Sequence, residues 1–194
     1  MAVSRLFEIL KEATPTISVG MLTADLMALG SQLKLLEQAE IRMLHFDVMD
    51  GVFCPMMTFG PPLIKAVKTP LFNDVHLMIT EPLEKVKDYV AAGADMITVH
   101  AESSIHIHRV LQALGKMSNQ NDPERGLIRG AALNPGTPVE VLEPLLDEIE
   151  MVTLLAVNPG WGGQQFIPST RQRVQRVRRM ISKSAREILV CVDG

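Results

Sequence analysis

The chain has 194 residues, of which 47% are hydrophobic and 21% charged. This length and composition are typical of one globular domain and exclude an intrinsically disordered or collagen-like protein. The formal charge of −3 at pH 7 lacks the basic excess typical of nucleic-acid binding, so we expect a small-molecule ligand and no nucleic-acid partner.

Seven short β-branched or apolar runs predict strands, at 16–22, 42–48, 72–79, 96–100, 128–133, 152–157 and 188–192. Stretches with helical periodicity separate them, near 24–39, 61–68, 82–92, 104–116, 138–148 and 169–184. Pro82, Pro138 and Pro168 lie where three of these helices would begin, a position at which proline loses no needed hydrogen bond. The alternation predicts repeated βα units around a parallel sheet.

Seven such units fit either an open α/β sheet or a TIM (β/α)8 barrel. Several β runs end in His, Asp, Asn or Gly, which favours the barrel because the carboxyl ends of barrel strands build one active-site face. The sequence stops at Gly194, directly after the seventh run. We therefore expect one α/β domain over residues 1–194, a TIM barrel that lacks its eighth βα unit and is incomplete at the C-terminus.

The cysteine content and the apolar runs bear on the compartment. Cys54 and Cys191 are the only cysteines, which favours a reducing compartment. Residues 1–13 mix apolar and charged side chains, unlike a signal peptide, and no run reaches the roughly 18 apolar residues of a spanning helix. We therefore expect a cytoplasmic protein with no membrane partner.

The densest group of polar side chains lies in the second β run. Residues two apart share a face of a strand, so His45, Asp47 and Met49 would face the lumen of a barrel. Phe46 and Val48 would face the other way. Imidazole and carboxylate groups could hold a metal ion there. Taken alone, however, the motif is also compatible with a solvated strand end.

The third and seventh β runs add to this group. Asp74, His76 and Met78 share a face in the third run, and Asp193 directly follows the seventh. Carboxylates on different strands could lie on opposite sides of a substrate, which suits proton removal from one face and return to the other. A divalent ion held by the same groups would stabilise an enolate oxygen. The pattern therefore predicts an epimerase or isomerase.

A glycine-rich loop, Asn158-Pro159-Gly160-Trp161-Gly162-Gly163-Gln164, follows the sixth β run. Glycines let backbone N–H groups approach an anion closely, and phosphate is the usual guest of such a loop in a barrel. The loop lacks the Lys-Ser/Thr ending of a Walker loop. A tight turn and a phosphate-binding loop therefore remain alternatives.

Three other features are interpreted as structural. The polar segment 115–126 is typical of a solvated connection. His100, His106 and His108 are interpreted as surface histidines. The last helix carries a basic run that is interpreted as a solvated face: Arg171, Arg173, Arg176, Arg178 and Arg179.

Together these motifs closely resemble the ribulose-phosphate 3-epimerase family. The matching stretches, in the family's order, are 22–25, 45–51, 74–78, 92–95, 99–102, 133–138, 157–164 and 192–194. The resemblance implies a TIM-barrel enzyme that interconverts D-ribulose 5-phosphate and D-xylulose 5-phosphate in the pentose phosphate pathway. It also implies two-base proton transfer at C3 through a metal-stabilised enediolate.

The resemblance also implies roles for individual residues. His45, Asp47, His76 and Asp193 would ligate one divalent metal ion, most commonly Zn²⁺, with Fe²⁺, Mn²⁺ or Co²⁺ as alternatives. Asp47 and Asp193 would also be the acid/base pair. The expected substrate-binding residues are His76, Met49 and Met78 near the reacting carbons and Gly160, Trp161, Gly162, Gly163 and Gly194 near the phosphate. A homo-oligomer is also expected.

Two positions depart from the family pattern. Gly20 stands where the family has a substrate-contacting serine, and Leu155 stands where it has a third capping methionine. A hexulose-6-phosphate 3-epimerase, acting for example on allulose 6-phosphate, is therefore an alternative, and so is a non-catalytic paralogue that binds a sugar phosphate. A Schiff-base aldolase is disfavoured because no lysine ends a predicted strand.

Overall fold

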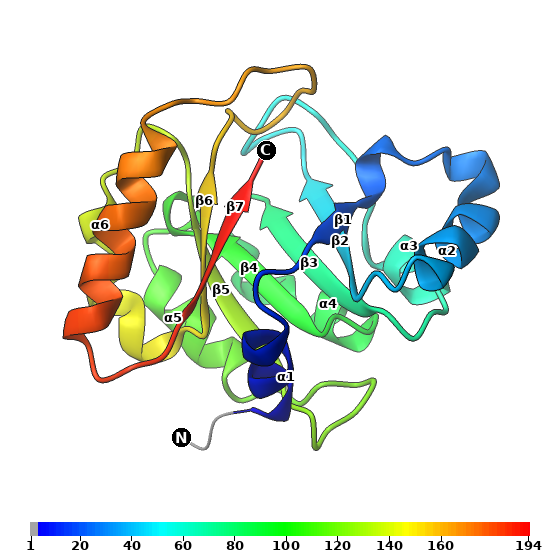
Figure 1. The fold of residues 1–194 in the computed structure, drawn as a ribbon, viewed down its shortest axis with the longest axis horizontal. Coiled ribbons are helices and arrows are strands. Elements are labelled where there is room, and N and C mark those ends of the chain that lie inside the picture. Colours follow the sequence, from blue (N-terminus) through cyan, green and yellow to red (C-terminus); the bar gives the residue numbers. More distant parts are fainter. Residues whose placement is uncertain (1–3) are drawn as a thin grey trace.

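The structure is a computed structural model that describes residues 4–194, and its centre is a seven-stranded parallel sheet (Figure 1). The strands are β1 (Ser18–Gly20), β2 (Met43–Met49), β3 (Phe72–Met78), β4 (Met96–His100), β5 (Ile128–Leu133), β6 (Met151–Leu155) and β7 (Leu189–Asp193). Each strand pairs in parallel with the next one in the sequence. The predicted α/β class is therefore confirmed.

The sheet is curled like part of a barrel (Figure 1). The side chain of Asp193 on β7 lies 3.1 Å from that of His76 on β3, although three strands separate β3 from β7 in the sheet. A flat sheet could not bring these residues into contact, since neighbouring strands lie about 4.8 Å apart. The described residues thus form a TIM-like barrel with seven strands and without an eighth βα unit.

The helices lie mainly between successive strands and cover the outside of the sheet (Figure 1). The α-helices are α1 (Arg5–Ala13), α2 (Leu29–Gln38), α3 (Pro61–Ala66), α4 (Val86–Ala91), α5 (Ile107–Leu114) and α6 (Thr170–Lys183). The 3₁₀ helices are η1 (Met21–Thr23), η2 (Leu26–Ala28), η3 (Pro82–Glu84), η4 (Ala101–Ser103) and η5 (Val139–Glu148). Within residues 4–194, none of these helices combines the length and the apolar character needed to cross a membrane.

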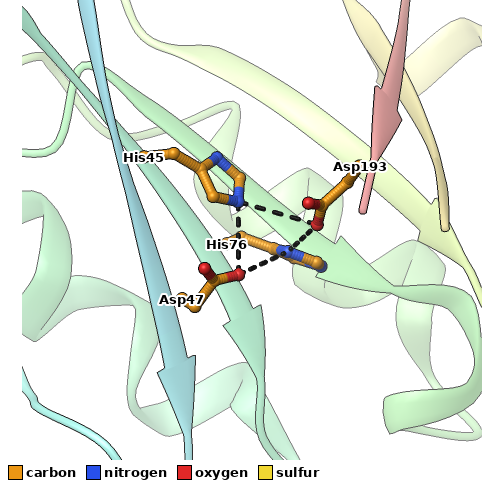
Figure 2. Close-up of side chains that lie close together, drawn as sticks. All are labelled: His45, Asp47, His76 and Asp193. Carbon is orange, nitrogen blue, oxygen red and sulfur yellow. Dashed lines mark ion pairs between the residues drawn. The ribbon is translucent and has the colours of Figure 1, made fainter. Parts of the chain in front are cut away.

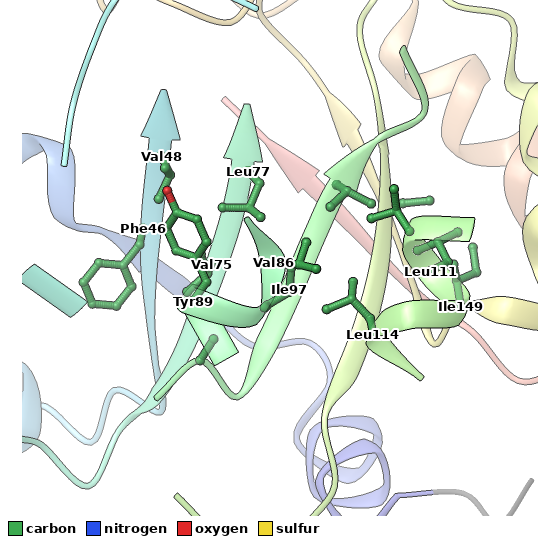
Figure 3. Close-up of a cluster of buried hydrophobic side chains, with 14 of the residues drawn as sticks. Phe46, Val48, Val75, Leu77, Val86, Tyr89, Ile97, Leu111, Leu114 and Ile149 are labelled. Carbon is green, nitrogen blue, oxygen red and sulfur yellow. The ribbon is translucent and has the colours of Figure 1, made fainter. Parts of the chain in front are cut away.

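The main core lies between the sheet and the outer helices. The predicted alternation along β2 is correct, since Phe46 and Val48 are buried in this core (Figure 3). Val75 and Leu77 on β3 and Ile97 on β4 continue the same layer toward α4 and α5. The opposite face of these strands therefore carries the polar side chains into the interior of the curl.

Helix α1 closes the other end of the interior and was not predicted. Its residues Leu6, Phe7 and Leu10 are buried against side chains from the starts of several strands, namely Met43, Met96, Ile128 and Met151. Ser4 caps the helix, because its Oγ accepts a hydrogen bond of 3.1 Å from the backbone N–H of Phe7. This plug of apolar side chains fills the interior of the curl at the amino-terminal end of the strands.

Two segments that were interpreted as solvated are in part buried. Asn119, in the polar segment 115–126, is fully buried, and its Nδ2 donates a hydrogen bond of 2.9 Å to Asp95 Oδ1. Arg173 on α6 is also buried and donates to the backbone carbonyls of Leu155, Asn134 and Thr137. Both predictions were therefore wrong for these residues, because a buried polar side chain is stable where it finds hydrogen-bond partners. The other four arginines of the basic run are exposed, as predicted: Arg171, Arg176, Arg178 and Arg179.

Candidate active site

Four side chains from three strands converge inside the curl (Figure 2). His45 Nε2 lies 3.3 Å from Asp47 Oδ1 and 3.7 Å from Asp193 Oδ2. His76 Nδ1 lies 3.1 Å from Asp193 Oδ2 and 3.6 Å from Asp47 Oδ1. The four atoms thus form a compact group in which each imidazole nitrogen faces two carboxylates.

The strand register explains this convergence. Asp47 on β2 pairs directly with His76 on β3, and His45 pairs with Asp74. Residues two apart on a strand share a face, so His45 and Asp47 both face the interior. Asp193 ends β7, where it pairs with Leu155 of β6. The parallel strands therefore present these groups at one edge of the sheet, close to their carboxyl ends.

The donor atoms fit a divalent metal ion. One nitrogen of each histidine, His45 Nε2 and His76 Nδ1, is buried and makes no hydrogen bond. A buried nitrogen without a partner is costly unless something else binds it. These nitrogens and one oxygen each of Asp47 and Asp193 all lie within 4.8 Å of one another. Two imidazoles and two carboxylates suit Zn²⁺, and also Fe²⁺, Mn²⁺ or Co²⁺.

The charges in this cluster stabilise one another. Burial alone would raise the pKa of the Asp47 and Asp193 carboxyls, but the close ion pairs with His45 and His76 outweigh it and hold the pKa of both well below the usual range. Burial alone would lower the pKa of His76, but Asp193 and Asp47 outweigh it and raise the pKa to about 9. Both carboxylates are therefore ionised at neutral pH.

Each histidine of the cluster has a further partner on its other nitrogen. His45 Nδ1 lies 2.7 Å from Asp74 Oδ2, which also accepts a hydrogen bond from Ser18 Oγ at 3.1 Å. Asp74 was placed on the correct face by the strand pattern, but no role was assigned to it. Its contact with His45 depends on the pairing of β2 with β3, which the sequence of one strand does not specify.

The prediction that His100 is a surface histidine was wrong. His100 is fully buried at the end of β4, and its Nε2 lies 2.9 Å from His76 Nε2. Burial, together with the neighbouring His76 and against the effect of Glu102, lowers the pKa of His100 to about 4. His106 and His108 are exposed, as predicted. The signal for His100 was its place at a predicted strand end, which His106 and His108 do not share.

A cavity of about 270 Å³ opens beside the cluster, at the carboxyl ends of the strands. Asp47 and Asp193 line this cavity. All but one of the residues predicted to bind substrate line it too, the exception being His76: Met49, Met78, Gly160, Trp161, Gly162, Gly163 and Gly194. Gly20 and Leu155, the two positions that depart from the family pattern, line the same cavity. The structure therefore brings the predicted substrate-binding residues together beside the two carboxylates.

Glycine is required at two positions of this lining. Gly160 has a φ of +111°, and a Cβ there would lie 2.6 Å from Pro55 Cδ. Gly194 has a φ of +127°, and a Cβ there would lie 2.8 Å from Val157 Cγ2. Both the backbone conformation and the close packing exclude a side chain. The Gly160 loop therefore packs tightly on the loop that follows β2.

Comparison with known proteins agrees with this geometry. Residues 16–194 match the model of a family described as the ribulose-phosphate 3 epimerase family. A protein of Bacillus subtilis (strain 168) named ribulose-phosphate 3-epimerase is 41% identical over 181 residues, which cover 92% of this chain and 80% of the relative. The matched region includes all seven strands and the whole His/Asp cluster, whereas α1 precedes it.

Two further relatives carry similar names. A protein of Arabidopsis thaliana named ribulose-5-phosphate-3-epimerase, chloroplastic, is 40% identical over 182 residues, which cover 92% of this chain and 62% of the relative. A protein of Escherichia coli (strain K12) named ribulose-phosphate 3-epimerase is 38% identical over 184 residues, which cover 92% of this chain and 77% of the relative. The similarity thus extends over nearly the whole described chain.

Proposed function

The chain belongs to the ribulose-phosphate 3-epimerase family, and we propose that it interconverts D-ribulose 5-phosphate and D-xylulose 5-phosphate by moving a proton at C3. The observation that carries the proposal is the pair Asp47 and Asp193. These carboxylates come from β2 and β7, reach the same two histidines, and line the same cavity. An epimerase needs such a pair, because the proton leaves one face of the carbon and another returns on the opposite face.

In this proposal the two carboxylates exchange roles with the direction of the reaction. One accepts the C3 proton on an oxygen. The other, which is ionised in the free protein, must first take up a proton, which it then donates to the opposite face of C3. The side chains of Asp47 and Asp193 are 18% and 22% exposed, so both reach the cavity although they are mostly buried. Burial also excludes water that would compete for the proton.

His45, Asp47, His76 and Asp193 would hold the divalent cation, with zinc as the first candidate. When bound, such a cation stabilises the negative charge that develops on a substrate oxygen as the neighbouring carbon loses its proton. The two histidines also hold the carboxylates in place through ion pairs of 3.1 to 3.7 Å. His76 is completely buried, so in this role it acts from behind the carboxylates.

The rest of the cavity would bind the sugar phosphate. Met49 and Met78 are buried next to one another and would pack against the apolar edge of the substrate near C3. Gly160, Trp161, Gly162 and Gly163, with Gly194, would surround the phosphate, where glycine allows close approach to backbone N–H groups. Gln164 supports the loop, since its side chain bonds the backbone N–H of Asn158 at 3.0 Å and the carbonyl of Trp161 at 2.9 Å.

A longer substrate is the second candidate, and Gly20 favours it. No atom lies within 4 Å of the position that a Cβ of Gly20 would occupy, so this wall of the cavity is open. The open space could accept the extra carbon of a hexulose 6-phosphate. The pentulose phosphate remains the first candidate because the three relatives described above are named for it.

The two substrates are compared directly in a steady-state assay of the zinc-loaded protein. We expect kcat/KM to be higher with D-ribulose 5-phosphate than with D-allulose 6-phosphate, and Gly20→Ser to reduce turnover of the hexulose more than turnover of the pentulose. A higher kcat/KM for the hexulose would replace the proposed substrate. Phosphate-ester binding without turnover of either sugar would identify a non-catalytic paralogue.

A further inference from the structure

A line of hydrogen-bonding groups leads away from the cluster behind His76. His76 Nε2 lies 2.9 Å from His100 Nε2, and the ring centroids lie 5.0 Å apart with planes that differ by 16°. The nitrogens are much closer than the ring centres, so the two imidazoles meet edge to edge, as a hydrogen bond between them requires. On its far side, His100 Nδ1 lies 3.2 Å from Glu102 Oε2.

Glu102 is itself fixed by the loop that follows β5. Its Oε1 accepts hydrogen bonds from the backbone N–H of Asn134, at 2.8 Å, and from Thr137 Oγ1. Burial alone would raise the pKa of Glu102, but the hydrogen bonds from His100 and Thr137 outweigh it and lower the pKa to about 2. Glu102 is therefore an ionised carboxylate, which can only accept hydrogen bonds.

The acceptor at Glu102 determines where the protons lie along this line. Because Glu102 only accepts, His100 Nδ1 must carry a proton and donate it. A neutral imidazole has one N–H, so His100 Nε2 is then an acceptor and His76 Nε2 must be the donor. In the neutral imidazole, the form that can bind a cation, the remaining nitrogen, His76 Nδ1, keeps its lone pair and faces Asp47 and Asp193.

His45, the other histidine of the cluster, has a similar arrangement in which the carboxylate contacts the imidazole directly. Asp74 Oδ2 lies 2.7 Å from His45 Nδ1, so His45 donates there and its Nε2 lone pair faces the cluster. A carboxylate thus fixes the tautomer of each histidine, directly at His45 and through one intervening imidazole at His76. The mechanism proposed above uses Glu102 and His100 in no step.

We infer that Glu102 and His100 are positioning residues, which act through His76 by fixing the tautomer that leaves its Nδ1 free to bind the divalent cation. The inference rests on the proposed function, because it assumes that the cluster holds a cation. Partners that orient metal-ligating histidines typically account for 10–100-fold in metal affinity. Glu102 and His100 would therefore affect the affinity for the cation first and catalysis only through it.

Glu102→Gln tests this relay, the hydrogen-bonded line from Glu102 through His100 to His76. A glutamine has one carbonyl oxygen and one NH₂ group. If the oxygen still accepts from the backbone N–H of Asn134, the NH₂ group faces His100 Nδ1 and donates to it. The tautomers of His100 and His76 are then both reversed, which places a proton on His76 Nδ1. We expect Glu102→Gln to weaken Zn²⁺ binding 10–100-fold, measured by competition with a chromophoric chelator. His100→Leu, which removes the acceptor for His76, should weaken it similarly, and His100→Asn should restore part of the affinity.

Glu81→Gln is the matched control. Glu81 follows β3 at the same edge of the sheet and accepts a hydrogen bond from Ser104 Oγ at 2.8 Å, but no histidine contacts it among the described hydrogen bonds and ion pairs. The substitution removes the same charge, and we expect Zn²⁺ affinity within twofold of that of the parent. ¹⁵N NMR of the histidine rings in metal-free protein, at a pH above the pKa of His76, provides a second measurement, in which Glu102→Gln should shift the proton of His76 from Nε2 to Nδ1.

The outcomes separate this inference from the proposed function. If the parent protein binds neither Zn²⁺ nor Co²⁺, the proposed metal-dependent function fails. If the parent binds Zn²⁺, and both variants, Glu102→Gln and His100→Leu, bind it as tightly as the parent does, only the inferred relay is overturned. Weakened binding in both variants with the His76 tautomer unchanged would also overturn it, because the effect would then be merely structural. Circular dichroism verifies that each variant is folded.

Discussion

Replacing Asp193 by asparagine tests the two-carboxylate account most severely. The amide has nearly the shape of the carboxylate, so the packing at the end of β7 is preserved. It cannot accept a proton from carbon, however, and it removes one of the two negative charges that face His45 and His76, at 3.7 and 3.1 Å. The variant therefore loses a proton-transfer group and a candidate metal ligand together.

The size of the effect follows from these two losses. A positioned general acid or base contributes about 10²–10⁴-fold in rate, which corresponds to about 3 to 5 kcal/mol in the activation free energy. The weaker metal site adds to this loss unless the cation is saturating. We therefore expect kcat for epimerisation to fall at least about 100-fold with Asp193→Asn at saturating Zn²⁺, and similarly with Asp47→Asn.

The assay follows both epimerisation and exchange of the C3 hydrogen with solvent deuterium. Each variant retains one carboxylate, so any residual exchange should occur without inversion and, in the two variants, from opposite epimers. Asp50→Asn is the control, because Asp50 follows β2 but binds the backbone N–H groups of Phe53 and Thr80 outside the cluster. A zinc-loaded Asp193→Asn protein with kcat within tenfold of the parent would refute the assigned role.

Three further predictions concern the need for a metal ion, the competition between protons and that ion for the histidines, and the packing of α1. Removing divalent ions with a strong chelator should abolish turnover, and added Zn²⁺, Mn²⁺ or Co²⁺ should restore it; full activity of rigorously metal-free protein would exclude the metal-dependent mechanism. Because Asp193 and Asp47 raise the pKa of His76 to about 9 against the effect of burial, protons compete with the cation at neutral pH. Zn²⁺ affinity measured by calorimetry should therefore fall as the pH falls from about 8 to about 6, and binding should release protons; a pH-independent affinity would contradict the described charges. Leu10→Ala, at a side chain that is 2% exposed, should lower the free energy of unfolding in urea by about 2 to 5 kcal/mol, whereas Leu26→Ala, at a side chain that is 53% exposed, should change it by less than about 0.5 kcal/mol; equal effects would show that α1 is not a structural plug.

The sequence predicts the strands and one face of the site well, for a physical reason. A strand has a period of two, so His45, Asp47 and Met49 must share a face once β2 is recognised. Parallel strands align their carboxyl ends at one edge, which brings His76 and Asp193 to the same place. The observed β4 (Met96–His100) and β5 (Ile128–Leu133) have the predicted bounds, and the end of β5 is marked by the turn signal Asn134-Pro135-Gly136.

What the sequence does not predict depends on contacts between distant segments. His100 and Arg173 are buried because β3, the end of β6 and the loop after β5 supply hydrogen-bond partners, whereas local polarity alone indicates exposure to solvent. Helix α1 is short and gains its stability by packing on the strand ends, as do most helices of its length. Near 138–148 a 3₁₀ helix forms, and Pro144 within it has no N–H to donate to an α-helical ladder.

The proposed function requires that this chain removes and returns a proton at C3 of a pentulose phosphate. It is tested most directly by NMR of D-ribulose 5-phosphate in D₂O with the zinc-loaded protein, which follows deuterium at C3 and the appearance of a second sugar phosphate. We expect deuterium at C3 together with D-xylulose 5-phosphate at equilibrium. Fully metal-loaded, folded protein that leaves the C3 hydrogen in place and forms no xylulose 5-phosphate would contradict it.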